Sequence, residues 1–93
     1  MSDSSDRSIS ALVGRPVVLD LASRYVCIGT LAESDAHFFM LVNADMHDLR
    51  DTSTTREIYV LDAKRHGVNP NRRQVSIRRE EVVGFSALDD VLE

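Results

Sequence analysis

The chain has 93 residues, of which 43% are hydrophobic and 28% are charged, with a net charge of −4. A chain of this length forms one domain and buries only about two-thirds of its unfolded surface, so a single small fold is expected. The acidic balance argues against a general polyanion binder, because such proteins gain affinity by neutralising phosphates. The single cysteine, Cys27, excludes an intrachain disulfide and fits a reducing compartment.

The sequence shows neither an apolar run of membrane-spanning length nor a signal-peptide pattern. We therefore expect a cytoplasmic protein that does not engage a membrane. Residues 1–7 are polar and predict a flexible tail. A short helix is predicted next, because Ile9, Leu12 and Val13 recur at helical spacing and Gly14 can end the helix in the left-handed conformation.

Alternating apolar residues predict a three-stranded antiparallel meander. Residues 17–21, 26–31 and 38–42 each show the period of two that is typical of half-buried strands. The polar residues 22–24 fit a hairpin turn. Gly29 lies inside the second strand, where a glycine indicates a bend or bulge.

The remainder of the chain is less regular. Residues 43–55 mix turn formers with acidic groups and predict a loop, whereas residues 56–63 alternate and predict a fourth strand. Residues 74–78 predict a further strand or a continuation of the fourth, and residues 81–86 predict the last one. The acidic residues 87–93 have room for one helical turn.

Charge is unevenly distributed along the chain. Residues 56–79 carry seven Lys or Arg against two acidic residues, whereas residues 80–93 carry five acidic residues and no basic one. The basic segment could meet phosphates. It could equally be a solvated hairpin surface.

Two stretches resemble a known family when taken together. Gly29-x-Leu31-x-x-x-Asp35, followed by an aromatic-rich strand, resembles the first motif of the Sm-like (LSm) proteins. Residues 75–83 resemble their second motif, an Ile-Arg-Gly followed by a polar residue and a hydrophobic strand. The likeness covers residues 8–88 and leaves 89–93 as an acidic C-terminal tail.

The resemblance implies a mainly β fold, namely a strongly bent five-stranded antiparallel barrel of the SH3-like type with a short N-terminal helix. It also implies a homo-oligomeric ring of six or seven protomers, in which the fourth strand of one copy pairs with the fifth strand of the next. Residues 74–78 and 81–86 would supply these edges. In this family a ring binds single-stranded RNA at the rim of its pore.

The resemblance also implies specific RNA contacts. His37 falls on the base-stacking position, and Arg78 falls on the arginine that completes the pocket. Phe39 stands where the family has an asparagine that reads the base edge, so uridine specificity is in doubt and a second stacking surface is expected. Asp35 is expected to hold the loop by accepting backbone N–H groups. Possible phosphate contacts are Arg72, Arg73 and Arg79.

Each of these residues also has a purely structural interpretation. Phe39 could pack against a neighbouring subunit, and His37 could be an ordinary surface histidine. Arg78 could pair with Asp35 or Glu80 instead of RNA.

An enzyme is not expected. Asp45, His47 and Asp48, with His66, are residue types that bind metals, but one loop without a second fixed ligand group is poor evidence for a site. Cys27 lies in a predicted strand, which suggests a buried side chain and not a nucleophile. The sequence therefore predicts neither a metal nor a cofactor.

The sequence leaves two alternatives open. A ring of the same kind could serve as a protein-interaction scaffold without binding nucleotides. The opening residues 12–18 also resemble the start of PRC-barrel modules, another class of small β-barrel.

Overall fold

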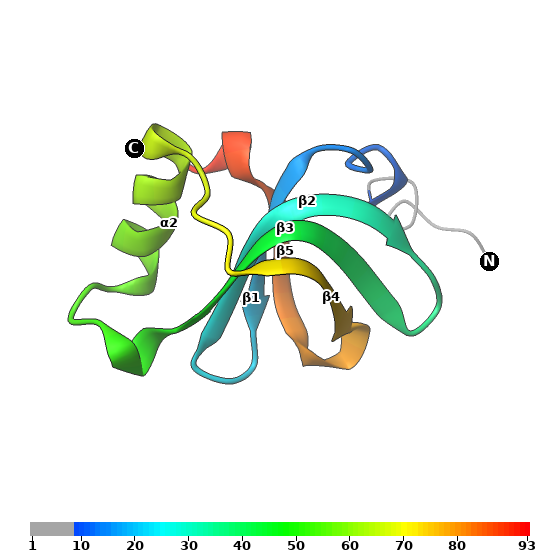
Figure 1. Cartoon of the computed structure of the whole chain (residues 1–93), viewed down its shortest axis with the longest axis horizontal. Helices are drawn as coiled ribbons and strands as arrows, with labels where there is room; N and C mark the ends of the chain where they lie inside the picture. The colour runs from blue at the N-terminus through cyan, green and yellow to red at the C-terminus, as the bar shows by residue number, and fades with distance from the viewer. Residues whose placement is uncertain (1–8) are drawn as a thin grey trace.

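The computed structural model describes residues 9–93, and Figure 1 shows a curved β-sheet with one helix at the end of the molecule. The fold is mainly β, with all strand pairs antiparallel in a single sheet. The strands are β1 (Pro16–Leu21), β2 (Tyr25–Ser34), β3 (Phe38–Asp48), β4 (Arg72–Arg78) and β5 (Val82–Ala87). Their order across the sheet is β4-β3-β2-β1-β5, which confirms the prediction of five antiparallel strands.

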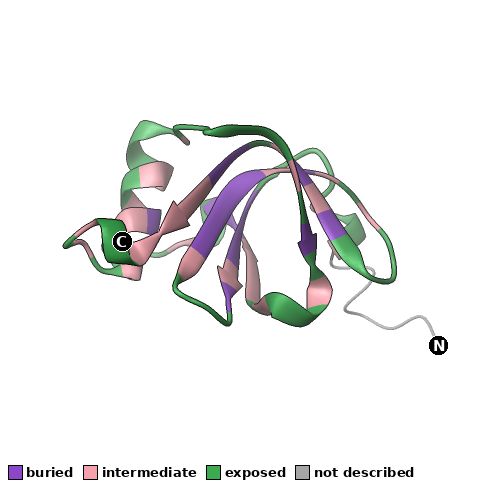
Figure 2. Ribbon diagram, turned by 60° about the horizontal axis from the view of Figure 1, so that its bottom comes forward, coloured by how far each residue is buried: buried purple, intermediate pink, exposed green. Residues whose placement is uncertain are grey.

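The predicted meander corresponds to β1, β2 and β3. β1 and β2 are buried on both faces, because their alternate residues enter two separate cores, whereas the buried apolar residues of β3 all belong to one core. Figure 2 shows the buried stretches along the strands. The inner core consists of Val17, Leu19, Leu21, Cys27, Leu31, Phe39, Leu41, Ala44 and Ile77. The outer core consists of Val18, Val26, Ile28, Val60 and Leu88. β1 and β2 therefore lie between the two cores.

The predicted bend at Gly29 is a kink that β2 shares with β3. The register passes from Ile28 opposite Asp45 to Thr30 opposite Val42, so two residues of β3 face Gly29 alone. Such an insertion is a β-bulge, and it bends the strand. A Cβ atom on Gly29 would lie 2.9 Å from the Cα of Ala44, so the close approach of two backbones requires a glycine here.

Two predictions for the middle of the chain are wrong. Residues 56–63 form no strand; they belong to helix α2 (Arg56–His66). Residues 43–48 are not part of a loop, because β3 continues to Asp48 and pairs with the first half of β2. The Oγ1 atom of Thr55 caps the helix by accepting a hydrogen bond of 3.3 Å from the backbone N of Ile58, and Gly67 ends it at a φ of 92°.

The sheet is not a closed barrel, in contrast to the expectation. Among residues 9–93, β4 pairs only with β3 and β5 pairs only with β1, so these two strands are the edges of the sheet. A short 3₁₀ turn, η2 (Arg79–Glu81), connects them. Each edge strand therefore leaves one row of backbone groups without a partner strand.

The two ends of the described chain pack onto the sheet. Ile9 and Leu12 pack against the inner core, whereas Val13 is 48% exposed. Gly14 has the expected positive φ of 87°. The predicted tail, residues 1–7, lies outside the described residues. At the other end, η1 (Leu49–Asp51) follows β3 and η3 (Leu88–Asp90) supplies the predicted helical turn.

Candidate functional site

The turn between β2 and β3 is built on Asp35. Its Oδ1 atom accepts hydrogen bonds of 2.8 Å from the backbone N–H groups of both His37 and Phe38, and its own N–H donates to the carbonyl of Phe38 at 3.0 Å. The hydrogen bonds from His37 and then Phe38 hold the pKa of Asp35 below its ordinary value, because they stabilise the carboxylate. This geometry confirms the expectation that Asp35 holds the loop.

A second connection lies against this turn. The backbone N–H of Arg79, the first residue of η2, donates to the carbonyl of His37 at 2.8 Å. Arg78 ends β4 directly opposite Phe38 in the β3–β4 pairing. The two connections therefore surround an open hollow of about 520 Å³, which we call the turn hollow and which is lined by Ala36, His37, Phe38, Arg78, Arg79 and Glu80.

Two adjacent phenylalanines, Phe38 and Phe39, differ in their burial. Phe39 is 4% exposed and belongs to the inner core; its ring centroid lies 5.0 Å from that of Phe85, and the guanidinium of Arg79 lies 4.6 Å from its centroid. Phe39 therefore has no free ring surface to offer a base. Phe38, which is 40% exposed, lines the turn hollow instead. No motif in the sequence singles out Phe38.

The arginines divide into two groups along the chain. Arg78 is exposed in the turn hollow and pairs with Glu80 at 3.1 Å, as one of the structural interpretations expected. Arg79 is half-buried over Phe39. Arg72 and Arg73 are exposed at the start of β4, and a seven-residue strand spans about 20 Å. These two arginines therefore lie outside the turn hollow.

A second polar cluster joins β3 to α2. The buried carboxylate of Asp45 accepts a hydrogen bond from the hydroxyl of Tyr59 and a longer one of 3.4 Å from Nδ2 of Asn71. The ring of His47 stacks on that of Tyr59, with centroids 3.9 Å apart. Burial, followed by the hydrogen bond to Asp45, raises the pKa of Tyr59. This cluster fastens the helix to the sheet.

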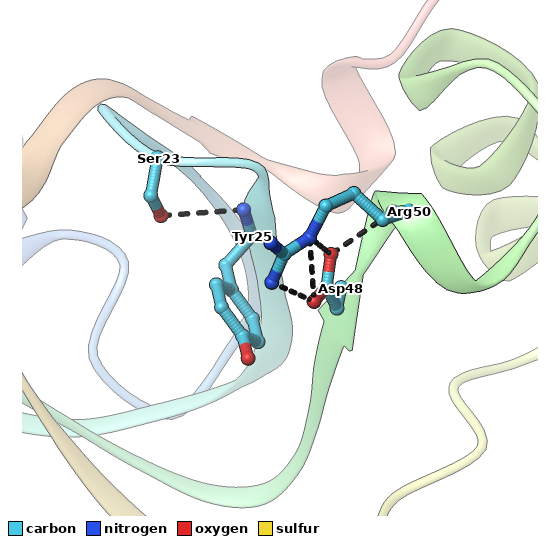
Figure 3. Close-up of polar contacts among 4 residues, drawn as sticks. All are labelled: Ser23, Tyr25, Asp48 and Arg50. Atoms are coloured by element: carbon cyan, nitrogen blue, oxygen red, sulfur yellow. Dashed lines mark hydrogen bonds and ion pairs between the residues drawn. The ribbon is translucent and has the colours of Figure 1, made fainter.

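The possible metal ligands do not converge. Asp48 is engaged by Arg50 and not by the cluster of Asp45 (Figure 3). Both of its carboxylate oxygens accept hydrogen bonds from the guanidinium of Arg50, and its Oδ1 also accepts one from the backbone N of that residue. His66 is exposed at the last residue of α2. Within residues 9–93 no group of three His, Cys, Asp or Glu side chains is placed to hold a metal ion.

Cys27 is fully buried in the inner core, as its place in a strand predicted. Burial, with a smaller contribution from the charge of Asp45, raises the pKa of its thiol to about 12. Because the thiolate is the nucleophilic form, the side chain is unreactive at neutral pH. Cys27 therefore acts as a small packing residue.

Comparison with known proteins provides no further guide. No protein-family model matches the chain, and no curated protein matches it significantly. In the part of the chain that the structure describes, no helix is long and apolar enough to cross a membrane.

The Asp35 turn makes a direct prediction for pH dependence. The amide resonances of His37 and Phe38 should titrate with a midpoint below 3.8, the ordinary pKa of an aspartate, because both amides donate to its carboxylate. A lowered folded pKa means that this interaction is complete above the unfolded pKa and is lost as the pH falls through the folded value. A pH series of amide NMR spectra measures it. The Asp35→Asn variant should lack this titration, and a midpoint at or above 3.8 would contradict the assignment.

Proposed function

We propose that this chain is an Sm-like protein that assembles into a homo-oligomeric ring and binds single-stranded RNA at the turn hollow, through His37, Phe38 and Arg78. The observation that carries the proposal is the turn hollow itself. It presents an exposed aromatic ring, an imidazole and a guanidinium within one open surface that two turns hold together. Single-stranded RNA is generally recognised by such combinations of stacking surfaces and polar groups.

The chemistry of the hollow suits a base attached to a phosphate chain. The ring of Phe38 offers a stacking surface, and stacking of a base on an aromatic side chain contributes about 1–3 kcal/mol. Arg78 lies directly across the strand pair from Phe38, where its guanidinium can contact either a phosphate or a base edge. Glu80 holds Arg78 in a pair whose two side chains are 66% and 70% exposed, so RNA can displace it at little cost.

The sheet topology supports assembly. β4 and β5 are the two edges of the sheet, and pairing of one with the other in a neighbouring copy would satisfy both rows of backbone groups. Repetition of the site around a ring raises the overall affinity, because each further contact becomes intramolecular. A ring of six or seven protomers thereby converts one modest stacking interaction into useful RNA binding.

A protein-interaction scaffold without nucleotide binding is the second candidate. The observation in its favour is the Arg78–Glu80 ion pair, which neutralises the one exposed arginine that lies beside Phe38. The net charge of −4 also weakens nonspecific attraction for RNA. Binding of short RNA oligonucleotides distinguishes the two candidate functions.

Fluorescence anisotropy with short oligouridine and oligoadenine, at about 50 and 200 mM salt, tests RNA binding. We expect binding at the lower salt concentration. Phe38→Ala should weaken it by about 5- to 150-fold for each base that stacks, because that factor corresponds to about 1–3 kcal/mol. Arg78→Ala should weaken it as well and reduce the dependence on salt.

The matched controls remove similar groups elsewhere. Ile58 is 51% exposed on α2, and Arg65 is an exposed helix residue that pairs with Glu93, so Ile58→Ala and Arg65→Ala should bind RNA as the parent chain does. Absence of binding to either oligonucleotide at the lower salt would favour the scaffold. Unchanged binding by both Phe38→Ala and Arg78→Ala would reject the turn hollow as the RNA site.

A further inference from the structure

A second polar hollow adjoins the turn hollow. It has a volume of about 530 Å³, and we call it the serine hollow; it is lined by Ser10, Ser34, Asp35, Ala36 and Arg79. Ala36 and Arg79 also line the turn hollow, so the two hollows are direct neighbours. A chain molecule that is bound in one of them therefore has a path into the other.

Arg79 is fixed at the junction of the two hollows. Its backbone N–H donates to the carbonyl of His37 at 2.8 Å, and its guanidinium lies 4.6 Å from the ring centroid of Phe39. The side chain is half-buried, in contrast to that of Arg78, which is exposed. A guanidinium that is already held in place loses less freedom when it contacts a phosphate, so this position favours binding.

The serine side of the second hollow suits a ribose. Ser10 is exposed in a short helical turn, and Ile9 and Leu12 pack that turn against the inner core. Ser34 is half-buried at the end of β2, opposite Phe39 in the pairing with β3. A serine hydroxyl can both donate and accept a hydrogen bond, as can the 2′-hydroxyl of a ribose. Among the described residues that line this hollow none is aromatic, so a base finds no stacking surface there.

We propose that each copy of this chain binds two successive nucleotides. The base of one stacks in the turn hollow, the ribose of the next lies in the serine hollow, and the phosphate between them contacts Arg79. This inference rests on the proposed function and extends its site. The carboxylate of Asp35 disfavours a phosphate inside the serine hollow, which leaves the junction at Arg79 for that group. The second nucleotide is held by its sugar and not by its base, so its base is not selected.

The test is an NMR titration of the parent chain at about 50 mM salt with uridine monophosphate, with the dinucleotide UpU and with the 2′-deoxy form of UpU. Uridine monophosphate should shift the amide resonances of His37 and Phe38, and UpU should shift those of Ser10 and Ser34 as well. The 2′-deoxy form should bind more weakly by about 2- to 12-fold for each hydrogen bond lost, the factor that corresponds to about 0.5–1.5 kcal/mol.

Variants separate the contributions of the sugar and the phosphate. Ser10→Ala/Ser34→Ala should bind UpU no better than its 2′-deoxy form, yet keep its affinity for uridine monophosphate. Ser53→Ala/Ser76→Ala is the matched control, because it removes two hydroxyls at exposed positions outside both hollows and should behave as the parent does. A methylphosphonate-linked UpU, which lacks the backbone charge, should bind the parent more weakly than UpU does, and Arg79→Gln should abolish that difference.

The outcomes distinguish this inference from the proposed function. Equal affinity of the parent for UpU and its 2′-deoxy form, or unshifted resonances of Ser10 and Ser34, would overturn the inference and leave the turn hollow standing as an RNA site. An Arg79→Gln variant that still distinguishes the two linkages would overturn it as well. Unshifted resonances of His37 and Phe38 with all of these ligands would overturn the proposed function and this inference together.

Discussion

Replacement of Gly29 by alanine is expected to lower the free energy of unfolding by about 2–3 kcal/mol, near the upper end of the range for overpacked sites. The new Cβ would lie 2.9 Å from the Cα and 3.0 Å from the Cβ of Ala44, and 3.2 Å from the carbonyl oxygen of Val42. Two of these three atoms belong to the backbone of β3, so relief requires the kink to open. Elsewhere a Gly to Ala change commonly stabilises a protein, because it restricts the unfolded chain. The sign of the effect is therefore informative.

Urea denaturation followed by circular dichroism measures this effect, and an unchanged m-value would show that stability alone has changed. Ser76→Thr is the matched control, because it also adds one methyl group to a strand but at an exposed position of β4. We expect it to change stability by less than about 0.5 kcal/mol. A Gly29→Ala variant as stable as the parent would show that the two strands do not approach so closely.

Removal of the hydroxyl of Tyr59 is the second large effect. In Tyr59→Phe the buried carboxylate of Asp45 keeps only the 3.4 Å hydrogen bond from Asn71 among the described residues. Because a hydrogen bond to a charged group contributes about 1.5–3 kcal/mol, we expect a loss of roughly that size at neutral pH. Hydrogen exchange should show that the amides of α2 lose protection first, since this cluster fastens the helix to β3.

The other tyrosine of the chain provides the control. Tyr25 is half-buried, and its hydroxyl makes no hydrogen bond within residues 9–93, so Tyr25→Phe should change stability by less than about 0.5 kcal/mol. Equal stability losses in the two variants would mean that the Asp45 hydrogen bond contributes nothing specific. Uniform loss of protection over the whole sheet in Tyr59→Phe would contradict a local role at α2.

The meander was predictable from the sequence, because period-two alternation is the direct signature of strands with a buried face. Helix α2 was predicted wrongly as a strand, although the signals at both of its ends are present: Thr55 can cap it, Glu57 lies in its first turn, and Gly67 follows its last turn. The helix contacts the outer core through Tyr59, Val60 and Ala63, while Ile58 points to solvent. This short apolar stripe is easily mistaken for an alternating strand.

The end of β3 was missed for a related reason. Asn43 and the acidic residues after it look like a loop, and Asn43 does have a positive φ of 49°. However, this single left-handed residue belongs to the bulge opposite Gly29, and the strand resumes beyond it. A local turn signal cannot reveal that partner residues in β2 restore the pairing.

The different burial of Phe38 and Phe39 shows the limit of assigning site residues by position. The alternation in residues 38–42 fixes which residues share a face, but not which face is buried, and a shift of one residue reverses every side chain. The inner core contains Phe39, Leu41 and Ile77, so Phe38 is left at the surface. Phe39 lies opposite Ile77 of β4, which is buried in the same core, so the pairing with β4 decides which face of β3 is buried. Ile77 is distant in the sequence, so residues 38–42 alone do not reveal this.

The burial of β1 and β2 on both faces has a consequence for the segment between β3 and β4. Such insertions are often dispensable, since long connections at a surface tolerate shortening. Here Val60 of α2 covers Val18, Val26 and Ile28, and Lys64 reaches the carbonyl of Val91. A chain trimmed to a tight β3–β4 turn would expose the apolar side chains of Val18, Val26 and Ile28 to water. The segment between β3 and β4 therefore covers the outer core of β1 and β2. Its exposed residues can be substituted, but its removal would uncover that core.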